Sequence, residues 1–454
     1  MSEEATLDEF VNNESGSDIS EEKVITSLDE TSVGEIPADW SAVRLGDLTE
    51  STLYGANESA EDYDPDKPRY IRIKDIDERG HLKETEMASL SADKAEGYLL
   101  EEGDMLFARS GSPGRTYLHR DDNGEYCYGG YSIKHELVSE GLNHEYLSQY
   151  TKSQKYWDWV ERIARTGAQA NINSPEYASL LVPLPPLPEQ RKIATVLYTV
   201  DRAIEKTEEV ITQTERLREG VMQDLFSRGV RDYDDFQETK YGTIPANWEV
   251  KPVREIADRI GSGGTPNTGK EEYYGGDIEW VKTDDLNSGL VDSAKTTITA
   301  KGLDESAAKL FPEGTVVFAM YGGALGQNGR LGMEAAMNQA CCGIVTNKSE
   351  MDSYLLHQQL IHRKKQLTAL SAGTNQQNIS QSMIEKFEVF VPPLNEQMEM
   401  ADILTSIERT IEANTNEREQ LKRLKRGMMQ DLFSGTVRTT DTNIEVPDEI
   451  TQYG

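Results

Sequence analysis

Hydrogen-bonding side chains recur at similar places in the two halves of the chain, on segments bounded by glycines. Arginine and lysine can pair with guanine O6 and N7, asparagine and glutamine with adenine N6 and N7, and the same groups can hold phosphates. The candidates in the first half are Lys74, Arg109, Ser110, Arg115, Lys134, Arg165, Gln169 and Asn171. Those in the second half are Lys282, Thr283, Tyr321, Gln327, Asn328, Arg330, Asn338, Gln339, Asn375, Gln376, Gln377 and Asn378. For a single residue a turn cap or a solvated loop is the commoner role, so only the recurrence predicts nucleic-acid contact, with Arg109 and Arg330 as first choices.

Motifs for catalysis do not accompany these residues. The segment Gly264–Lys270 approaches a phosphate-binding loop, but Glu271 stands where a serine or threonine should hold magnesium. Asp235–Lys240 has the residue types of a metal-dependent nuclease, yet it lies in a polar linker between the halves. We therefore expect a non-catalytic chain that carries no cofactor or metal of its own.

The elements that must position these residues come from a duplication. Pro185–Ser227 aligns without a gap to Pro392–Ser434 at an offset of 207, and 20 of the 43 aligned positions are identical. In each copy a proline run is followed by Glu-Gln where helical periodicity begins, and each copy closes on Met-Gln-Asp-Leu-Phe. The chain is therefore interpreted as two repeated halves.

Apolar residues in both copies follow steps of four and three, which predicts two long helices. About 35 to 40 residues at 1.5 Å per residue make each helix roughly 55 to 60 Å long. The predicted seam comprises Ile193, Leu197, Val200 and Ile204, with Met400, Leu404, Ile407 and Ile411 in the second copy. It continues through Leu217, Val221 and Leu225, and through Leu424, Met428 and Leu432. The natural partner of each stripe is its duplicate, paired antiparallel, although each helix could instead pack only on its own domain.

Short strands between glycine turns are predicted in the remainder of each half, followed by helices at His144–Ile163 and Ser353–Leu370. The halves open at the similar segments Ile36–Trp40 and Ile244–Trp248 and share little identity outside these landmarks. The predicted divisions are an acidic tail 1–30, a domain 31–182, a helix 183–230, a linker 231–243, a domain 244–389, a helix 390–438 and an acidic tail 439–454.

The net charge of −33 argues against a generally basic DNA-binding surface. Residues 1–30 carry −9 and residues 439–454 carry −4, so both tails are expected to be disordered, and −20 remains for residues 31–438. An acidic surface of the kind used by salt-loving organisms is the other interpretation. The three cysteines form no CxxC motif, and no apolar run approaches 18 residues, so a cytoplasmic protein is expected.

The sequence resembles the specificity subunit of type I restriction-modification systems. The resemblance rests on PPLPEQRKIATVL and PPLNEQMEMADIL, on the closing MQDLF of both helices, on IPADW and IPANW, on ETKYGTIPANWEV and on GDMLFARSG. These motifs cover residues 36–438, nearly the whole chain.

This resemblance implies an α+β fold of two α/β target-recognition domains, each followed by a long helix, with the helices paired as an antiparallel coiled coil. Each domain is then expected to read one half of a split site in double-stranded DNA. The expected partners are methyltransferase subunits, of which two are anticipated, and restriction or translocase subunits. S-adenosylmethionine, ATP and magnesium are expected in those partners. The main rival is a coiled-coil adaptor that holds two protein-binding modules.

Overall fold

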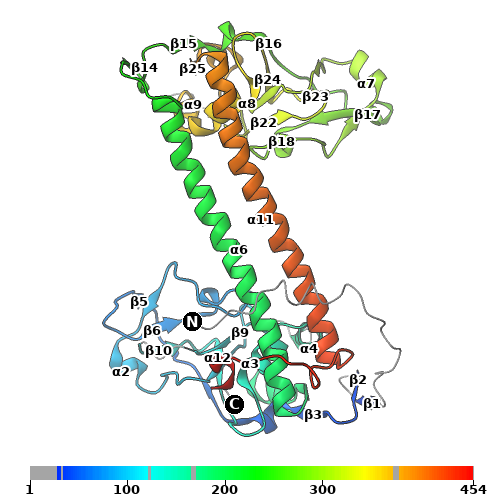
Figure 1. Ribbon diagram of the computed structural model, residues 1–454. Helices are drawn as coiled ribbons and strands as arrows, with labels where there is room; N and C mark the ends of the chain where they lie inside the picture. The colour runs from blue at the N-terminus through cyan, green and yellow to red at the C-terminus, as the bar shows by residue number, and fades with distance from the viewer. Residues whose placement is uncertain (1–27, 32–33, 121–123, 165–169, 372–377, 453–454) are drawn as a thin grey trace. The chain divides into compact units, whose positions relative to one another are not determined.

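The computed structural model describes residues 28–31, 34–120, 124–164, 170–371 and 378–452. It divides into two compact units, of which unit 1 takes residues 1–206 and 418–454 and unit 2 takes residues 207–417. Each unit holds one mixed α/β domain and about half of two long helices, α6 (Leu187–Arg228) and α11 (Leu394–Ser434) (Figure 1). The predicted fold class is confirmed. No helix within the described residues is both long and apolar enough to cross a membrane.

Unit 1 contains two four-stranded sheets and two strand pairs. The first sheet has the order β4-β11-β8-β9 and is antiparallel: β4 (Thr49–Tyr54), β8 (Met105–Ala108), β9 (Thr116–Leu118) and β11 (Ser132–Leu137). The second has the order β10-β6-β7-β5: β5 (Glu61–Asp62), β6 (Arg69–Ile71), β7 (Ala88–Ser89) and β10 (Tyr126–Tyr128). The pairs are β1 (Leu28–Thr31) with β2 (Gly34–Pro37), and β3 (Ser41–Arg44) with β12 (Leu181–Leu184). The helices are α2 (Ala92–Ala95), α3 (His144–Tyr150), α4 (Gln154–Ala164) and α5 (Ser174–Ala178).

Unit 2 repeats this arrangement with one additional strand. Its larger sheet has the order β16-β24-β21-β22-β18: β16 (Ala257–Ser262), β18 (Leu290–Val291), β21 (Val316–Ala319), β22 (Asn328–Leu331) and β24 (Cys341–Thr346). Its smaller sheet has the order β19-β17-β23-β20: β17 (Tyr274–Val281), β19 (Thr297–Ile298), β20 (Leu310–Phe311) and β23 (Ala335–Met337). The pairs are β13 (Phe236–Thr239) with β14 (Gly242–Pro245), and β15 (Glu249–Pro252) with β25 (Glu388–Val391). The helices are α7 (Ala300–Asp304), α8 (Ser353–His362), α9 (Lys364–Ala369) and α10 (Gln381–Lys386).

The central strands β8 and β21 are the glycine-bounded segments expected from the sequence. Their apolar runs, Met-Leu-Phe-Ala and Val-Val-Phe-Ala, are at most 1% exposed, because the sheet is covered on both faces. Gly103 and Gly314 precede these strands with positive φ angles of 93° and 85°, which only glycine adopts at low cost. The turn into each strand therefore depends on that glycine.

The two long helices pack antiparallel within each unit. In unit 1, Ile193 and Leu197 near the start of α6 share a core with Leu432 and Phe433 near the end of α11. Farther along α6, Val200 and Ile204 pack with Leu421, so the residue numbers run in opposite directions along the two helices. In unit 2 the other ends pair in the same way, with Met222 and Leu225 of α6 beside Met400 and Leu404 of α11. The predicted antiparallel pair is confirmed.

The seam differs in detail from the predicted stripe. Its predicted members Ile193, Leu197, Val200, Ile204, Met400 and Leu404 are at most 4% exposed, whereas Ile407 and Ile411 are half-buried. Leu217 and Leu424 are 57% and 46% exposed, so their assignment to the seam is wrong. The next residues, Arg218 and Lys425, turn inward instead, because each has an acidic partner on the other helix.

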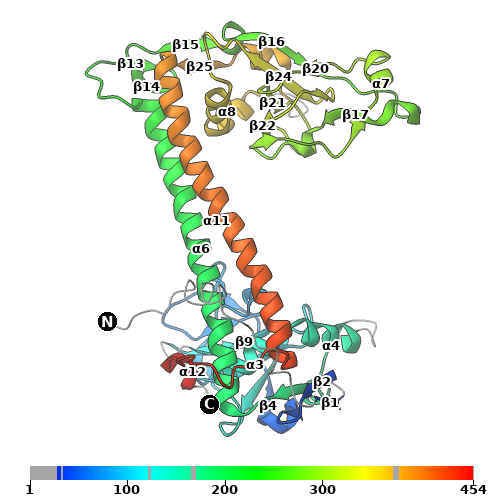
Figure 2. The ribbon, with the colours of Figure 1, turned by 45° about the vertical axis from the view of Figure 1, so that its right-hand side comes forward.

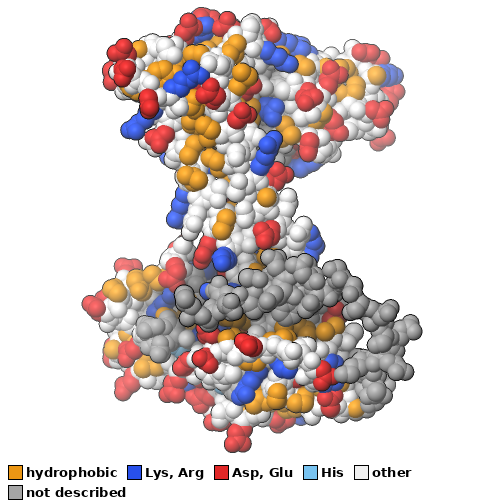
Figure 3. Space-filling model, viewed as in Figure 1, with side chains coloured by type: hydrophobic (Ala, Val, Ile, Leu, Met, Phe, Trp, Pro, Cys, Tyr) orange, Lys and Arg blue, Asp and Glu red, His pale blue; other side chains and the backbone are white. Residues whose placement is uncertain are grey.

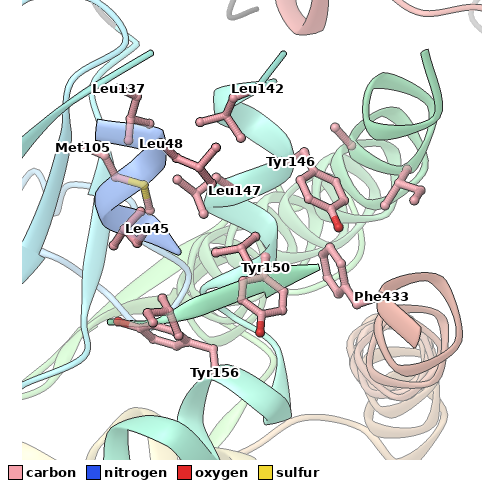
Figure 4. Close-up of a cluster of buried hydrophobic side chains, with 14 of the residues drawn as sticks. Leu45, Leu48, Met105, Leu137, Leu142, Tyr146, Leu147, Tyr150, Tyr156 and Phe433 are labelled. Carbon is pink, nitrogen blue, oxygen red and sulfur yellow. The ribbon is translucent and has the colours of Figure 1, made fainter. Parts of the chain in front are cut away.

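The closing Leu-Phe of each helix anchors it in a domain core. Phe433 of α11 meets the rings of Tyr146 and Tyr150 of α3 edge-on, with centroids 5.4 Å apart in both cases (Figure 4). Its counterpart Phe226 of α6 is 3% exposed in the core of unit 2 and contacts the ring of His362. The repeated motif therefore closes each helix against the domain in which the other long helix begins.

Two predicted helices are each broken into two. Between α3 and α4 the hydroxyl of Thr151 donates to the carbonyl of Ser148 at 2.8 Å, which competes with continued helical bonding. Between α8 and α9 Arg363 leaves the helical region at φ −102° and ψ 20°, and its guanidinium packs on the rings of Tyr241, Phe387 and Phe390.

The C-terminal segment was expected to be disordered, and this expectation is wrong for residues 439–452. The short helix α12 (Asp448–Thr451) places Ile450 in the unit 1 core, where it is 1% exposed. The side-chain amide of Asn143, which caps α3, donates to the carbonyl of Ile450 at 2.7 Å. Helix α12 is drawn in red in both ribbon views (Figures 1 and 2). The linker predicted at 231–243 likewise contains β13 and the start of β14. Residues 1–27 lie outside the described residues.

Candidate nucleic-acid interface

Three loops and a connector meet at one end of the large sheet in unit 1. The loops follow β4, join β8 to β9 and join β10 to β11, and the connector leads into α5. Arg109, directly after β8, links them through its backbone. Its N–H donates to the carbonyl of Tyr131 at 2.8 Å, and its carbonyl accepts from Ile172 at 2.8 Å. A backbone bridge between Ser110 and Asn171 continues the contact.

Side chains of this cluster reach the surface. The Arg109 guanidinium lies 4.9 Å from the centre of the Tyr54 ring, a cation–π contact. The Tyr54 hydroxyl accepts from the backbone N–H of Ser174 at 3.2 Å, so the ring is held from its far end. Tyr131 is 68% exposed, the highest value among the large apolar or aromatic side chains of the described chain. The arrangement presents one cation and two aromatic rings to solvent.

Unit 2 builds the same cluster with other side chains. Met320 occupies the position of Arg109: its N–H donates to Ala340 and its carbonyl accepts from Ile379, both at 2.8 Å. Met320 is 7% exposed and belongs to the core. The exposed groups are the Thr265 hydroxyl and the Gln339 amide, which hydrogen bond to each other. The backbone frame is repeated, but the surface chemistry changes from cationic and aromatic to hydroxyl and amide.

Glycines permit the close approach of two of these loops. A Cβ on Gly55 would lie 2.3 Å from the carbonyl oxygen of Gly129, and one on Gly263 would lie 1.9 Å from that of Met337. Both distances are well inside van der Waals contact with backbone, which cannot move aside as a side chain can. The loop after β4 or β16 can therefore rest on its neighbour only where glycine is present.

Of the residues predicted in the first half, Arg109, Ser110 and Asn171 meet in this cluster. Lys134 does not: it is 7% exposed and paired with Asp104 at 3.2 Å and Glu136 at 2.8 Å. We therefore withdraw Lys134 as a predicted DNA contact, because its charge is already neutralised by carboxylates inside the sheet. Burial lowers the pKa of Lys134, but these two carboxylates outweigh burial and raise it.

The other first-half candidates lie elsewhere or outside the described residues. Lys74 is exposed and paired with Glu86 at 2.9 Å, and a guanidinium N–H of Arg115 donates to the carbonyl of Ile76 at 3.0 Å. Gln169 lies outside the described residues.

In the second half, Gln327 and Tyr321 lie on the half-buried loop between β21 and β22. Asn328 is fully buried and is therefore withdrawn as a surface contact. It is the first residue of β22, so the polar loop before this strand ends one residue earlier than expected. Arg330 lies over the Tyr354 ring at 5.8 Å and Lys282 over the Trp280 ring at 5.1 Å. Asn375, Gln376 and Gln377 lie outside the described residues.

The sequence of both halves matches a known family. The model of the type I restriction modification DNA specificity domain matches residues 37–216 and again residues 245–423. The chain belongs to this family. Each matched specificity domain begins at the Ile-Pro-Ala opening and extends into the long helix that follows, so the two matches are the two copies of the repeat.

Individual relatives agree with this assignment. The putative type I restriction enzyme MjaX specificity subunit of Methanocaldococcus jannaschii is 25% identical over 427 residues, which are 90% of this chain and 96% of the relative. The type I specificity subunit from M. genitalium has a similar fold, with a TM-score of 0.57 at 15% identity over 90% of this chain and 99% of that one. A chain from a type I restriction-modification system gives 0.54 at 18% identity, covering 88% and 99%.

The Glu-Gln pair that follows each proline run joins each long helix to its domain. Gln190 accepts from the N–H of Asn143 at 2.8 Å and donates to the carbonyls of Gly141 and Pro185. Gln397 makes the equivalent bonds, accepting from Asp352 at 2.8 Å and donating to Glu350 and Pro392. Each glutamine therefore ties the proline run to the start of α3 or α8.

The preceding glutamates are buried and hold the tryptophans of the two openings. Trp40 donates to Glu189, and Trp248 donates to Glu396, both at 3.0 Å. The chain that leaves the other long helix completes each site: Arg438 donates to Glu189 at 2.8 Å, and the hydroxyl of Tyr233 donates to Glu396 at 2.5 Å. These bonds fasten the two helix ends of one unit to the same domain.

A second polar contact joins both helices to each specificity domain. In unit 1 Gln149 of α3 donates to Asp201 of α6 at 3.0 Å, and Lys425 of α11 donates to the same carboxylate. In unit 2 Gln358 of α8 donates to Glu408 of α11 at 2.9 Å, and Arg218 of α6 lies 3.3 Å from that carboxylate. The members correspond one to one at offsets of 207 or 209.

Sequence reasoning missed Tyr54, Tyr131 and Thr265. They are isolated aromatic or hydroxyl residues with no recurrence between the halves, and only the fold brings them beside Arg109 or Gln339. The Gly-Gly pairs at 129–130 and 263–264 were the available signal, since they mark where loops approach closely. Within the described residues no group of three His, Cys, Asp or Glu side chains could hold a metal ion.

Proposed function

We propose that this chain is the DNA sequence-recognition subunit of a type I restriction-modification complex, in which each specificity domain reads one half of a bipartite site. The observation that carries the proposal is the three-loop cluster, whose backbone contacts are repeated at Arg109 and Met320 while its exposed side chains differ. A repeated frame with different surface groups is what two readers of different base sequences require.

The long helices would tie the two readers together and bind the methyltransferase subunits. Catalysis would reside in the partners: two methyltransferase subunits using S-adenosylmethionine, and restriction or translocase subunits using ATP and magnesium, all in the cytoplasm. Support comes from family membership and from the helices themselves, whose ends are fixed by buried bonds in each unit.

The acidity of the chain limits how DNA could be held. On the face drawn in Figure 3, carboxylates and basic side chains are interspersed on the described surface of each unit rather than gathered into a basic stripe. Affinity would then rest on local contacts at the loops and on partner subunits, because a general positive field is lacking.

A domain exchange tests the proposal. Residues 36–182 are replaced by the corresponding segment of a relative, the variant is expressed with its partner subunits, and methylated adenines are mapped across the host genome by single-molecule sequencing. One half of the methylated site should change while the other half stays. The matched exchange of residues 244–389 should change only the other half. Change in both halves, or in neither, would refute modular reading, and an adaptor of protein modules predicts no methylation pattern that follows the exchange.

A further inference from the structure

No carboxylate pairs with Arg109 in the described residues, whereas several other cations of unit 1 are paired. Arg72 pairs with Asp75 at 2.8 Å, Lys74 with Glu86 at 2.9 Å, and Arg120 with Glu145 at 2.6 Å. For the Arg109 guanidinium the described residues provide the Tyr54 ring and no hydrogen bond or ion pair, and its buried Nε has no partner.

The surroundings of Arg109 hold the residue in place through its backbone and leave the N–H donors of its guanidinium unused. Both backbone polar groups of Arg109 are hydrogen bonded, to Tyr131 and Ile172, so its position relative to two loops is fixed. The hydroxyl of the buried Tyr177 donates to the carbonyl of the preceding Ala108 at 2.6 Å, which steadies the end of β8. The stacked guanidinium keeps its N–H groups for a ligand and loses little rotamer freedom on binding.

We infer that Arg109 reads a guanine in the half-site bound by the first specificity domain. This inference rests on the proposed function. A planar fork of N–H donors matches the two acceptors of guanine, O6 and N7, whereas adenine replaces O6 by an N6 amino donor that would oppose the guanidinium. Guanine is therefore the base that satisfies both donors at once.

The second domain provides an internal comparison. At the position of Arg109 it has Met320, which has no donor and is 7% exposed, and the nearby exposed groups are Thr265 and Gln339. The guanine contact accordingly belongs to one half-site alone. The structure thus assigns the two half-sites different chemistry at equivalent places in the frame.

The test uses the full chain assembled with its methyltransferase subunits and a duplex carrying the mapped methylation site. Each guanine of the first half-site is replaced in turn by 7-deazaguanine, which lacks the N7 acceptor, and binding is followed by fluorescence anisotropy. One replacement should weaken binding roughly ten- to hundred-fold. With Arg109→Ala the unmodified duplex should already bind this much more weakly, and the same replacement should have no further effect.

Matched variants separate reading from folding and from charge. Arg109→Lys keeps the charge and can still donate to guanine, but it loses the planar fork, so its discrimination between guanine and 7-deazaguanine should be smaller than that of the wild type and larger than that of Arg109→Ala. Tyr54→Phe retains the stacking ring and should keep discrimination, whereas Tyr54→Leu should reduce it. Arg44→Ala removes an exposed arginine of β3 and should leave discrimination unchanged.

Three results would overturn the inference while leaving the proposed function intact: no guanine in that half-site, a deazaguanine penalty that persists in Arg109→Ala, or equal weakening on every duplex. The last is the behaviour of a phosphate contact. If the assembled complex binds DNA without sequence preference, the proposed function and this inference both fail.

Discussion

The ammonium of Lys425 on α11 donates to both carboxylate oxygens of Asp201 on α6, at 2.7 Å each, and both residues are less than a tenth exposed. This buried pair lies inside the helix seam of unit 1, and the Asp201 carboxylate also accepts a hydrogen bond from the side-chain amide of Gln149 in the domain. Burial raises the pKa of Asp201, but Lys425 and Lys152 outweigh burial and lower it below its usual value.

Removal of one member should therefore be costly. Lys425→Met leaves a buried carboxylate without its main cation, and we expect the free energy of unfolding to fall by about 3 to 5 kcal/mol. Urea denaturation of the full chain, followed by tryptophan fluorescence, measures this. The double variant with Asp201→Leu should recover part of the loss, and Arg426→Met, an exposed residue on the same helix, should change stability by less than about 0.5 kcal/mol. A single variant as stable as the wild type would mean that the pair does not hold the seam.

A matched leucine pair tests the corrected seam. Leu421 is 7% exposed and packs on Val200 and Ile204, whereas Leu424, one turn later, is 46% exposed. Leu421→Ala should lower the free energy of unfolding by about 2 to 4 kcal/mol, because it leaves a cavity. Leu424→Ala should cost less than about 0.5 kcal/mol. A loss of stability in Leu424→Ala as large as that in Leu421→Ala would return Leu424 to the seam.

Order in the C-terminal segment can be tested in the same way. Ile450 is 1% exposed in the unit 1 core and Val437 is 48% exposed. Ile450→Ala should destabilise the chain by about 2 to 4 kcal/mol, and Val437→Ala should have little effect. Hydrogen exchange near Asn143 should also accelerate in Ile450→Ala, since the Asn143 amide bonds to this segment. Equal stability of both variants would indicate that the segment does not pack on the domain.

His135 should make stability depend on pH. It is fully buried against Phe107, and burial lowers its pKa to about 4 from 6.5. The unfolded chain therefore takes up a proton first as the pH falls below 6.5, so stability declines from there and the decline levels off below about pH 4. Between pH 7 and 5 this residue should cost roughly 2 kcal/mol. Urea denaturation of His135→Asn at both pH values should show a smaller decline than the wild type; an equal decline would assign the pH dependence to other groups.

The acidic surface leads to a prediction about salt. Proteins that neutralise six to ten phosphates lose roughly 10³- to 10⁵-fold in DNA affinity between 50 and 200 mM salt. With −20 on residues 31–438, the assembled complex should lose less than about tenfold over this range and should keep binding in concentrated potassium chloride, where carboxylates are screened. Titration of the cognate duplex across potassium chloride concentrations measures the slope. A steep loss would exclude salt adaptation as the reason for the acidity.

The sequence by itself determined the repeat, the two long helices and their proline boundaries. Periodicity and proline act locally, so Ile193, Leu197, Met400 and Leu404 could be placed on a buried stripe without a fold. The same local reasoning placed Leu217 and Leu424 on the stripe and missed Arg218 and Lys425, because burial of a charge depends on a partner about 200 residues away.

Only the tertiary structure decided which polar residues are available for binding. Lys134 and Asn328 have suitable side chains but are buried, while Tyr54 joins Arg109 only because β4 and β8 both flank β11. Such neighbourhoods follow from strand order and loop approach, which involve residues far apart in sequence. Residue type and spacing therefore identified the kind of site, whereas nonlocal packing selected its members.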